Sequence, residues 1–131
     1  MTHPFIEHVN LTVSDPVRTA SLMIAIFGWH ERWRGPAQSG GHTIHVGSDR
    51  AYIALYAPPS GIEAGLHYPK GEPLNHVGVQ VDDLEAVETR VKAVGLLPFN
   101  HGDYEPGRRF YFFDPDGIEY EVVSYAEPAP R

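Results

Sequence analysis

The sequence contains no cysteine in its 131 residues. This absence excludes a disulfide framework, a thiolate zinc site, an iron–sulfur cluster and a cysteine nucleophile, and it fits a reducing compartment. Any bound metal must therefore use histidine and carboxylate ligands, and the chain supplies 8 His and 17 Asp plus Glu residues.

Positive charge is also scarce. The 10 Lys and Arg residues are outnumbered by 17 Asp and Glu residues, which leaves a formal net charge of −7. This sign disfavours binding to a phosphate backbone, so we expect no nucleic-acid partner. No apolar run approaches the roughly 18 to 20 residues that span a bilayer, and the first residues lack the basic and apolar stretches of a signal peptide. We therefore expect a cytoplasmic protein without a membrane partner.

The first half of the chain predicts one strand, one helix and three further strands. Apolar and polar residues alternate over 5–13, which is typical of a half-buried strand. Asp15 followed by proline predicts the start of a helix, and Gly28 predicts its end. Short strands around turns follow within 30–57. The apolar stripe of the helix is expected to consist of Val17, Ala20, Ile24 and Phe27.

The second half repeats this order. Alternation over 74–81 predicts a strand, Asp83 predicts the start of a helix, and Gly95 predicts its end. A final hairpin is predicted around 114–117, where aspartate, proline and glycine occupy positions that a type I turn favours. A connector rich in proline and glycine separates the two halves. The chain is therefore interpreted as an internal duplication of a βαβββ unit.

This organisation predicts an α+β fold made of two βαβββ repeats, at about residues 4–57 and 74–126. A single repeat is too small to bury one face of its own sheet. We therefore expect both repeats to pack into one domain over residues 1–131.

Three potential metal ligands occupy related places in the two repeats. His8 lies in the first strand of the first repeat, His76 lies at the same place in the second, and Glu121 lies in the last strand. If the apolar residues of these strands pack under the helices, the three side chains point to the opposite, concave face. Two imidazoles and one carboxylate leave coordination positions open, and such a set suits Fe(II), Mn(II), Zn(II) or Ni(II). The alternative is that each is an ordinary hydrogen-bonded or solvated strand residue.

The openings Glu7-His8-Val9 and Asn75-His76-Val77, and the ending Phe-Asp-Pro-Asp-Gly-Ile-Glu-Tyr-Glu at 113–121, resemble the vicinal oxygen chelate superfamily. This superfamily includes glyoxalase I, extradiol dioxygenases, fosfomycin-resistance transferases, methylmalonyl-CoA epimerase and metal-free bleomycin-binding proteins. The resemblance covers about residues 4–126. It implies a cup-shaped mixed β-sheet that holds one divalent metal ion.

Carried over position by position, the resemblance assigns the metal ligands to His8, His76 and Glu121. Glyoxalase I and its closest relatives place a fourth ligand, usually Glu or Gln, where this chain has Ala54. Alanine neither binds a metal nor accepts a proton, so standard glyoxalase I activity is not expected. The set of two His and one Glu is the pattern of the extradiol dioxygenases, which favours Fe(II), with Zn, Mn or Ni as alternatives.

Further candidates lie near these positions. Tyr52 and Tyr56 flank Ala54 on its face of the strand, where they line the substrate pocket or place a phenol near the metal. The alternative is that these aromatic residues fill the cup or form a subunit contact. Near the final hairpin, arginine suits a substrate carboxylate or phosphate, and histidine suits an acid or base. The catalytic candidates are Tyr56, His101 and Arg109, and the substrate-binding candidates are Tyr52, Tyr104 and Arg108.

These observations predict a divalent-metal-dependent enzyme, glyoxalase-like or dioxygenase-like, that acts on a small oxygenated molecule able to chelate the metal. Dioxygenase chemistry is slightly preferred over a lyase, isomerase or transferase reaction. The alternative is a metal-free protein that sequesters a small molecule such as an antibiotic. A homodimer is expected, because superfamily members commonly pair units across chains and a sheet edge needs cover.

Overall fold

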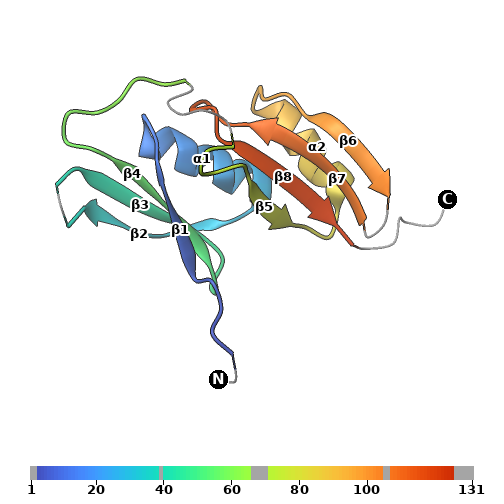
Figure 1. Ribbon diagram of the computed structural model, residues 1–131, viewed down its shortest axis with the longest axis horizontal. Helices are drawn as coiled ribbons and strands as arrows, with labels where there is room; N and C mark the ends of the chain where they lie inside the picture. The colour runs from blue at the N-terminus through green and yellow to red at the C-terminus, as the bar shows by residue number, and fades with distance from the viewer. Residues whose placement is uncertain (1–2, 39, 66–70, 105–106, 126–131) are drawn as a thin grey trace. The chain divides into compact units, whose positions relative to one another are not determined.

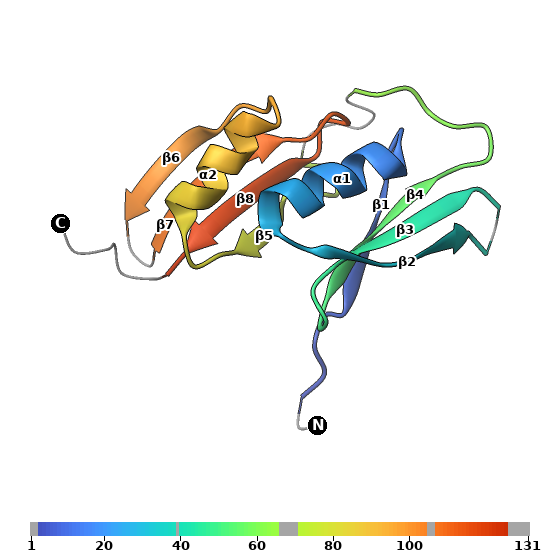
Figure 2. The same cartoon turned by 180° about the vertical axis from the view of Figure 1, so that it is seen from behind.

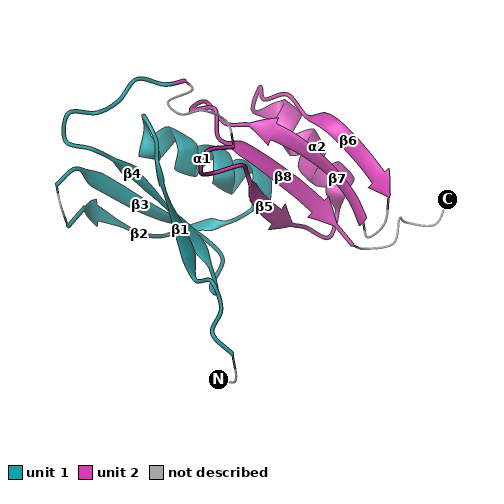
Figure 3. Cartoon of the chain, viewed as in Figure 1, with its two compact units in different colours: residues 1–64 teal, residues 65–131 magenta. Residues whose placement is uncertain are grey.

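Two four-stranded mixed sheets, each accompanied by one helix, make up the described part of the chain (Figures 1 and 2). The computed structural model describes residues 3–38, 40–65, 71–104 and 107–125. The chain divides into two units, residues 1–64 and 65–131, which are coloured separately in Figure 3. The predicted α+β class and the tandem βαβββ order are confirmed. Packing of both units into one domain stays a prediction.

In the sheet of unit 1, the strand that comes last in the sequence lies beside the strand that comes first. The elements are β1 (His8–Thr12), α1 (Pro16–Phe27), β2 (His30–Pro36), β3 (His42–Gly47) and β4 (Tyr52–Ala57). The strand order in the sheet is β1-β4-β3-β2. The β1–β4 pair is parallel, whereas β4–β3 and β3–β2 are antiparallel. The helix is therefore part of the long connection that a parallel pair requires.

Unit 2 has the same topology. Its elements are β5 (Val77–Gln80), α2 (Leu84–Ala93), β6 (Phe99–Tyr104), β7 (Gly107–Phe113) and β8 (Glu119–Ser124). The order is β5-β8-β7-β6, with β5 parallel to β8 and the other pairs antiparallel. Identical strand orders in the two units agree with the predicted duplication.

Both helices begin and end close to the predicted residues. Asp15 and Asp83 each accept a hydrogen bond from a backbone N–H in the first turn, at 3.1 and 3.0 Å. Gly28 caps the end of α1 with a φ of 71°, and Gly95 follows α2 with a φ of 86°. This left-handed conformation favours glycine over other residues. No helix in the described part of the chain is long and apolar enough to cross a membrane.

The buried side of α1 differs from the prediction. Val17 and Ile24 are 48% and 38% exposed, although both were expected in the apolar stripe. The helix buries instead Pro16, Thr19, Ala20, Met23 and Ile26. Because apolar residues occur on several sides of this helix, their spacing does not fix which side faces the sheet.

The strand β6 has no clear apolar alternation in the sequence. Its pairing with β7 shifts register between Phe99 and Gly102, and Asn100 within the shift has a φ of 56°. An irregularity of this kind moves the following side chains to the other face of the sheet. The repeat order indicates that a strand belongs here, but the local pattern does not.

Each sheet buries one face under the helix of its own unit, which differs from the expectation that a single repeat is too small to do so. In unit 1, α1 contacts β3 and β4, and in unit 2, α2 contacts β7 and β8. The buried strand residues on these faces are Ile44, Val46, Ile53 and Leu55 in unit 1 and Phe110, Phe112, Tyr120 and Val122 in unit 2. Because side chains alternate along a strand, Ala54 and Glu121 lie on the opposite faces of their sheets.

The turn between β7 and β8 depends on the carboxylate of Asp114. Its Oδ1 atom accepts hydrogen bonds from the backbone N–H groups of Asp116 at 2.9 Å and Ile118 at 3.0 Å. The hydroxyl of Tyr120 donates to Oδ2 at 3.5 Å. Asp114 is only 5% exposed, and burial raises the pKa of its carboxyl to about 6. A buried acid thus organises the turn that precedes Glu121.

This burial predicts a pH-dependent stability. The pKa of Asp114 is raised in the folded state, so the folded state binds more protons and the free energy of unfolding falls as pH rises from about 4 to about 6. Asp114→Asn keeps an acceptor oxygen without the charge. We expect wild type to lose about 2 kcal/mol relative to Asp114→Asn between about pH 4.5 and about pH 7, measured by urea unfolding.

Asp114→Ala is the matched control, because it leaves two buried N–H groups without their acceptor. It should lose roughly 2 kcal/mol or more at every pH. Parallel stability profiles for wild type and Asp114→Asn would contradict the raised pKa.

Candidate functional site

The parallel pairing of β5 with β8 brings a histidine and a carboxylate together in unit 2. His76 directly precedes β5, and Glu121 in β8 lies opposite Gly78. The Nε2 atom of His76 lies 2.9 Å from Oε1 of Glu121. The side chain of Glu121 is 14% exposed, so its charge is largely withdrawn from water. Both residues were predicted as metal ligands.

The other ring nitrogen of this histidine is also held. Nδ1 of His76 lies 2.7 Å from Oδ1 of Asn75, its neighbour in sequence. Unit 1 repeats the arrangement, because Nδ1 of His8 lies 2.9 Å from Oε1 of Glu7. In both cases Nδ1 donates a hydrogen bond to the oxygen of the preceding residue, and this contact fixes the orientation of the ring. The other ring nitrogen, Nε2, therefore points away from the preceding residue. Metal-binding histidines are commonly oriented by such a partner on the second nitrogen.

Glu121 has a second charged partner. Nη1 of Arg109, in β7, donates to Oε2 of Glu121 at 3.0 Å, and the Arg109 side chain is 12% exposed. The guanidinium also lies over the ring of Tyr104, 4.8 Å from its centroid. Arg109 and Tyr104 were both predicted as site residues, and the structure places them on one face with Glu121.

Tyr111 completes this group, although the sequence analysis did not single it out. It pairs with Glu121 across the two strands, and its ring meets the ring of His76 edge-on at 5.8 Å. Burial and then the charge of Glu121 raise the pKa of the Tyr111 hydroxyl above its ordinary value. The phenol therefore keeps its proton at neutral pH and is able to donate a hydrogen bond.

The donor atoms of His76 and Glu121 form a direct ion pair, and their spacing also allows both to contact one divalent cation. Nitrogen and oxygen ligands lie about 2.0 to 2.2 Å from Zn(II), and two such ligands at a right angle are about 3 Å apart. The observed separation of 2.9 Å is close to this value. Among the described residues, however, no group of three His, Asp or Glu side chains is clustered as a complete metal site. The third predicted ligand, His8, belongs to unit 1.

In unit 1, aromatic rings line the face that contains Ala54. His8 stacks on Tyr52 with centroids 4.8 Å apart, and His45 stacks on Tyr52 at 4.5 Å. The ring of Trp33 lies 5.2 Å from His45, and the guanidinium of Arg32 lies 4.6 Å from the centroid of Tyr52. Burial lowers the pKa of His45 below its ordinary value, and the charge of His8 lowers it further.

Ala54 lies between Asn10 in β1 and His45 in β3. It is 3% exposed, so the neighbouring side chains cover it. Tyr56, predicted as catalytic, lies on the same face at the far end of β4, opposite Thr12 and Thr43.

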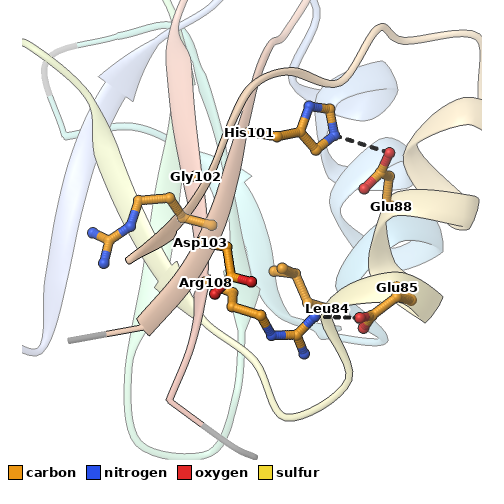
Figure 4. Close-up of a pocket in the computed structure, with 8 residues that line it drawn as sticks. Leu84, Glu85, Glu88, His101, Gly102, Asp103 and Arg108 are labelled. Atoms are coloured by element: carbon orange, nitrogen blue, oxygen red, sulfur yellow. Dashed lines mark hydrogen bonds and ion pairs between the residues drawn. The ribbon is translucent and has the colours of Figure 1, made fainter. Parts of the chain in front are cut away.

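Two predicted residues lie on the other side of the sheet of unit 2. His101 and Arg108 point toward α2, where Nε2 of His101 lies 3.0 Å from Glu88 and Arg108 forms an ion pair with Glu85 (Figure 4). These residues and their neighbours line a cavity of about 280 Å³ between α2 and the strands β6 and β7. Neither His101 nor Arg108 is grouped with Glu121.

Three features of the site were missed in the sequence. Glu7 and Asn75 hold the two histidines, and their signal was an oxygen-bearing side chain directly before each histidine. Tyr111 had a signal in the hairpin register, since counting back from the turn pairs it with Glu121. His45 had a similar signal, since counting back from the turn between β3 and β4 pairs it with Ala54.

The family model described as the Glyoxalase/Bleomycin resistance protein/Dioxygenase superfamily matches residues 5–122. No curated protein matches the sequence.

Several solved structures share the fold. A glyoxylase/bleomycin resistance protein/dioxygenase domain from Frankia sp. EAN1pec has a TM-score of 0.80 at 23% identity, covering 94% of this chain and 93% of its own. The fosfomycin resistance protein FosX from Listeria monocytogenes, crystallised with Mn(II) and sulfate, has a TM-score of 0.71 at 18% identity and covers 94% and 93%. TnmS3, an antibiotic binding protein from Streptomyces sp. CB03234, has a TM-score of 0.68 at 18% identity and covers 95% and 98%.

Proposed function

Because the chain belongs to the Glyoxalase/Bleomycin resistance protein/Dioxygenase superfamily, we propose that it is a divalent-metal-dependent enzyme acting on a small oxygenated molecule that chelates the metal. The observation that carries this proposal is the pair formed by His76 and Glu121. Their donor atoms are 2.9 Å apart, and the remaining ring nitrogen of His76 is held by Asn75. An imidazole oriented in this way toward a carboxylate is a common half of a metal site.

His8 is the third ligand in this proposal. It stands at the repeat position that corresponds to His76, and Glu7 holds its Nδ1 atom as Asn75 holds that of His76. His8 comes either from unit 1 of the same chain or from unit 1 of a second copy, because we also propose a homodimer. Two imidazoles and one carboxylate suit Fe(II), which we favour, and also Mn(II), Zn(II) or Ni(II). The Mn(II) found with FosX supports a divalent ion for this fold.

A bound ion of this kind would act as a Lewis acid toward the substrate oxygens. The chain itself contributes the surrounding groups. The protonated phenol of Tyr111 beside Glu121 is able to donate a hydrogen bond to a developing oxyanion, and Tyr52 and Tyr56 offer further phenols in unit 1. Ala54 removes the second carboxylate that would move a proton between adjacent carbons, so we favour dioxygenase-type chemistry over that of glyoxalase I.

A metal-free binding protein is the second candidate, and a specific observation favours it. The rings of Trp33, His45, Tyr52 and His8 form a continuous row in unit 1. Aromatic rows bind planar molecules by stacking without any metal. The antibiotic binding protein TnmS3 has the same fold, which fits this role. A ligand that binds equally well in the presence of a chelator would support this second candidate.

The proposed site predicts one equivalent of metal per chain in protein purified under anaerobic conditions. His76→Ala and Glu121→Gln should each lose most of this metal, because each removes one of the three ligands. His101→Ala is the matched control, since this histidine faces a glutamate on the other side of the same sheet. Metal content is measured by mass spectrometry of the digested protein, and folding is checked by circular dichroism.

Equal metal content in wild type and His76→Ala would contradict the ligand assignment. Absence of metal from wild type, also after reconstitution with Fe(II) and Mn(II), would favour the metal-free candidate.

Asn75→Leu tests the orientation of His76 separately from its ligand atom. Without the Oδ1 acceptor, Nδ1 no longer fixes the ring, and metal affinity should fall by about 10- to 100-fold with unchanged stoichiometry. The affinity is measured by competition with a fluorescent chelator. An unchanged affinity would mean that the contact between Asn75 and His76 has no role in metal binding.

A further inference from the structure

The ion pair between Arg109 and Glu121 uses only part of the hydrogen-bonding capacity of the arginine. We propose that Arg109 recognises an anionic group of the ligand, a carboxylate or a phosphonate, and that Glu121 occupies it only while no metal is bound. This inference rests on the proposed function, because metal binding to Glu121 is the event that frees Arg109 for the anion. The substrate class then narrows to small chelating molecules that carry an oxyanion.

The first support is the incomplete hydrogen bonding of the Arg109 guanidinium. Nη1 donates to Glu121 at 3.0 Å, and Nη2 reaches only the carbonyl oxygen of Gly107 at 3.4 Å. Nε is buried and has no hydrogen-bond partner among the residues that the structure describes. A buried donor without an acceptor costs free energy, and it is rare in folded proteins. Arg109 therefore has donor capacity for an additional acceptor.

The second support is the position of the guanidinium. The Arg109 side chain is 12% exposed, and its guanidinium lies over the ring of Tyr104, which is 61% exposed. An arginine that stacks on an aromatic ring keeps its planar edge available for a bidentate contact with an oxyanion. The site thus contains a preformed cation, next to the carboxylate that we propose as a metal ligand.

The third support is the charge balance around Glu121. Oε1 is close to His76 and Oε2 accepts from Arg109, so both oxygens are already engaged. A divalent cation bound to Glu121 competes directly with Arg109 for this carboxylate. Once the carboxylate charge is shared with a metal ion, Arg109 loses its strongest partner and needs another anion. Metal binding should therefore strengthen anion binding, and by thermodynamic linkage the anion should strengthen metal binding.

The neighbouring Arg108 provides a contrast. It lies one position along β7, so its side chain is on the opposite face, where it pairs with Glu85 of α2. The two arginines have similar chemistry, but only Arg109 is next to Glu121. Arg108→Met is therefore a matched control for Arg109→Met.

The experiment measures binding of methylphosphonate by isothermal titration calorimetry, first with metal-free full-length protein. Glu121→Gln removes the carboxylate charge with little change in shape, so Arg109 becomes available without any metal. We expect Glu121→Gln to bind methylphosphonate at least about tenfold more tightly than wild type, because the freed Arg109 makes one additional charge-assisted hydrogen bond. The double variant Glu121→Gln/Arg109→Met should lose this gain, whereas Glu121→Gln/Arg108→Met should keep it. Folding of every variant is checked by thermal unfolding.

A second arm uses wild type loaded with Mn(II). Methylphosphonate should bind more tightly than to metal-free wild type, and Arg109→Met should abolish this increase while Mn(II) still binds. If Glu121→Gln shows no gain, or if the gain survives Arg109→Met, the role of Arg109 is contradicted even when Mn(II) binds. If Mn(II) fails to bind but the gain in Glu121→Gln depends on Arg109, the metal enzyme is contradicted, and Arg109 stands as the anion site of a metal-free binding protein.

Discussion

The parallel pairing of β5 with β8 is the constraint on which the candidate site depends. Parallel neighbours in one sheet cannot be joined by a tight turn, so a helix and two further strands separate them in sequence. The register of this pair places His76, before the first strand, beside Glu121 in the last. Asp114 organises the turn before β8, and so a buried acid away from the site helps to set the position of Glu121.

Much of the fold could be predicted because its signals are local. Alternation, the caps at Asp15 and Asp83, and the turn at Asp114 each depend on a few neighbouring residues, and repetition of their order reveals the duplication. The buried side of α1 could not be predicted, since Val17 and Ile24 are as apolar as the residues that face the sheet. That choice is made by packing against strands far away in sequence.

The placement of His101 shows how one irregularity limits a prediction for the site. Phe99 stacks with Phe113 and pairs with Tyr111, on the face of the sheet that carries Glu121. Strict alternation would place His101 on this same face. The register shift in β6 moves His101 to the helix side, where it meets Glu88. By contrast, the regular hairpin of β7 and β8 fixes Arg109 and Glu121 on one face, and this register is readable from the turn.

The two repeats share topology but differ in chemistry. Unit 1 presents stacked rings around Ala54, whereas unit 2 presents Glu121 between an imidazole and a guanidinium. We propose that His8 and His76 bind the same divalent ion together with Glu121. Pulsed electron paramagnetic resonance of the Mn(II)-loaded protein, with histidine labelled by nitrogen-15, tests it most directly. Coupling of the ion to two histidine nitrogens in wild type is the predicted result; coupling to a single histidine nitrogen, or to none, would contradict it.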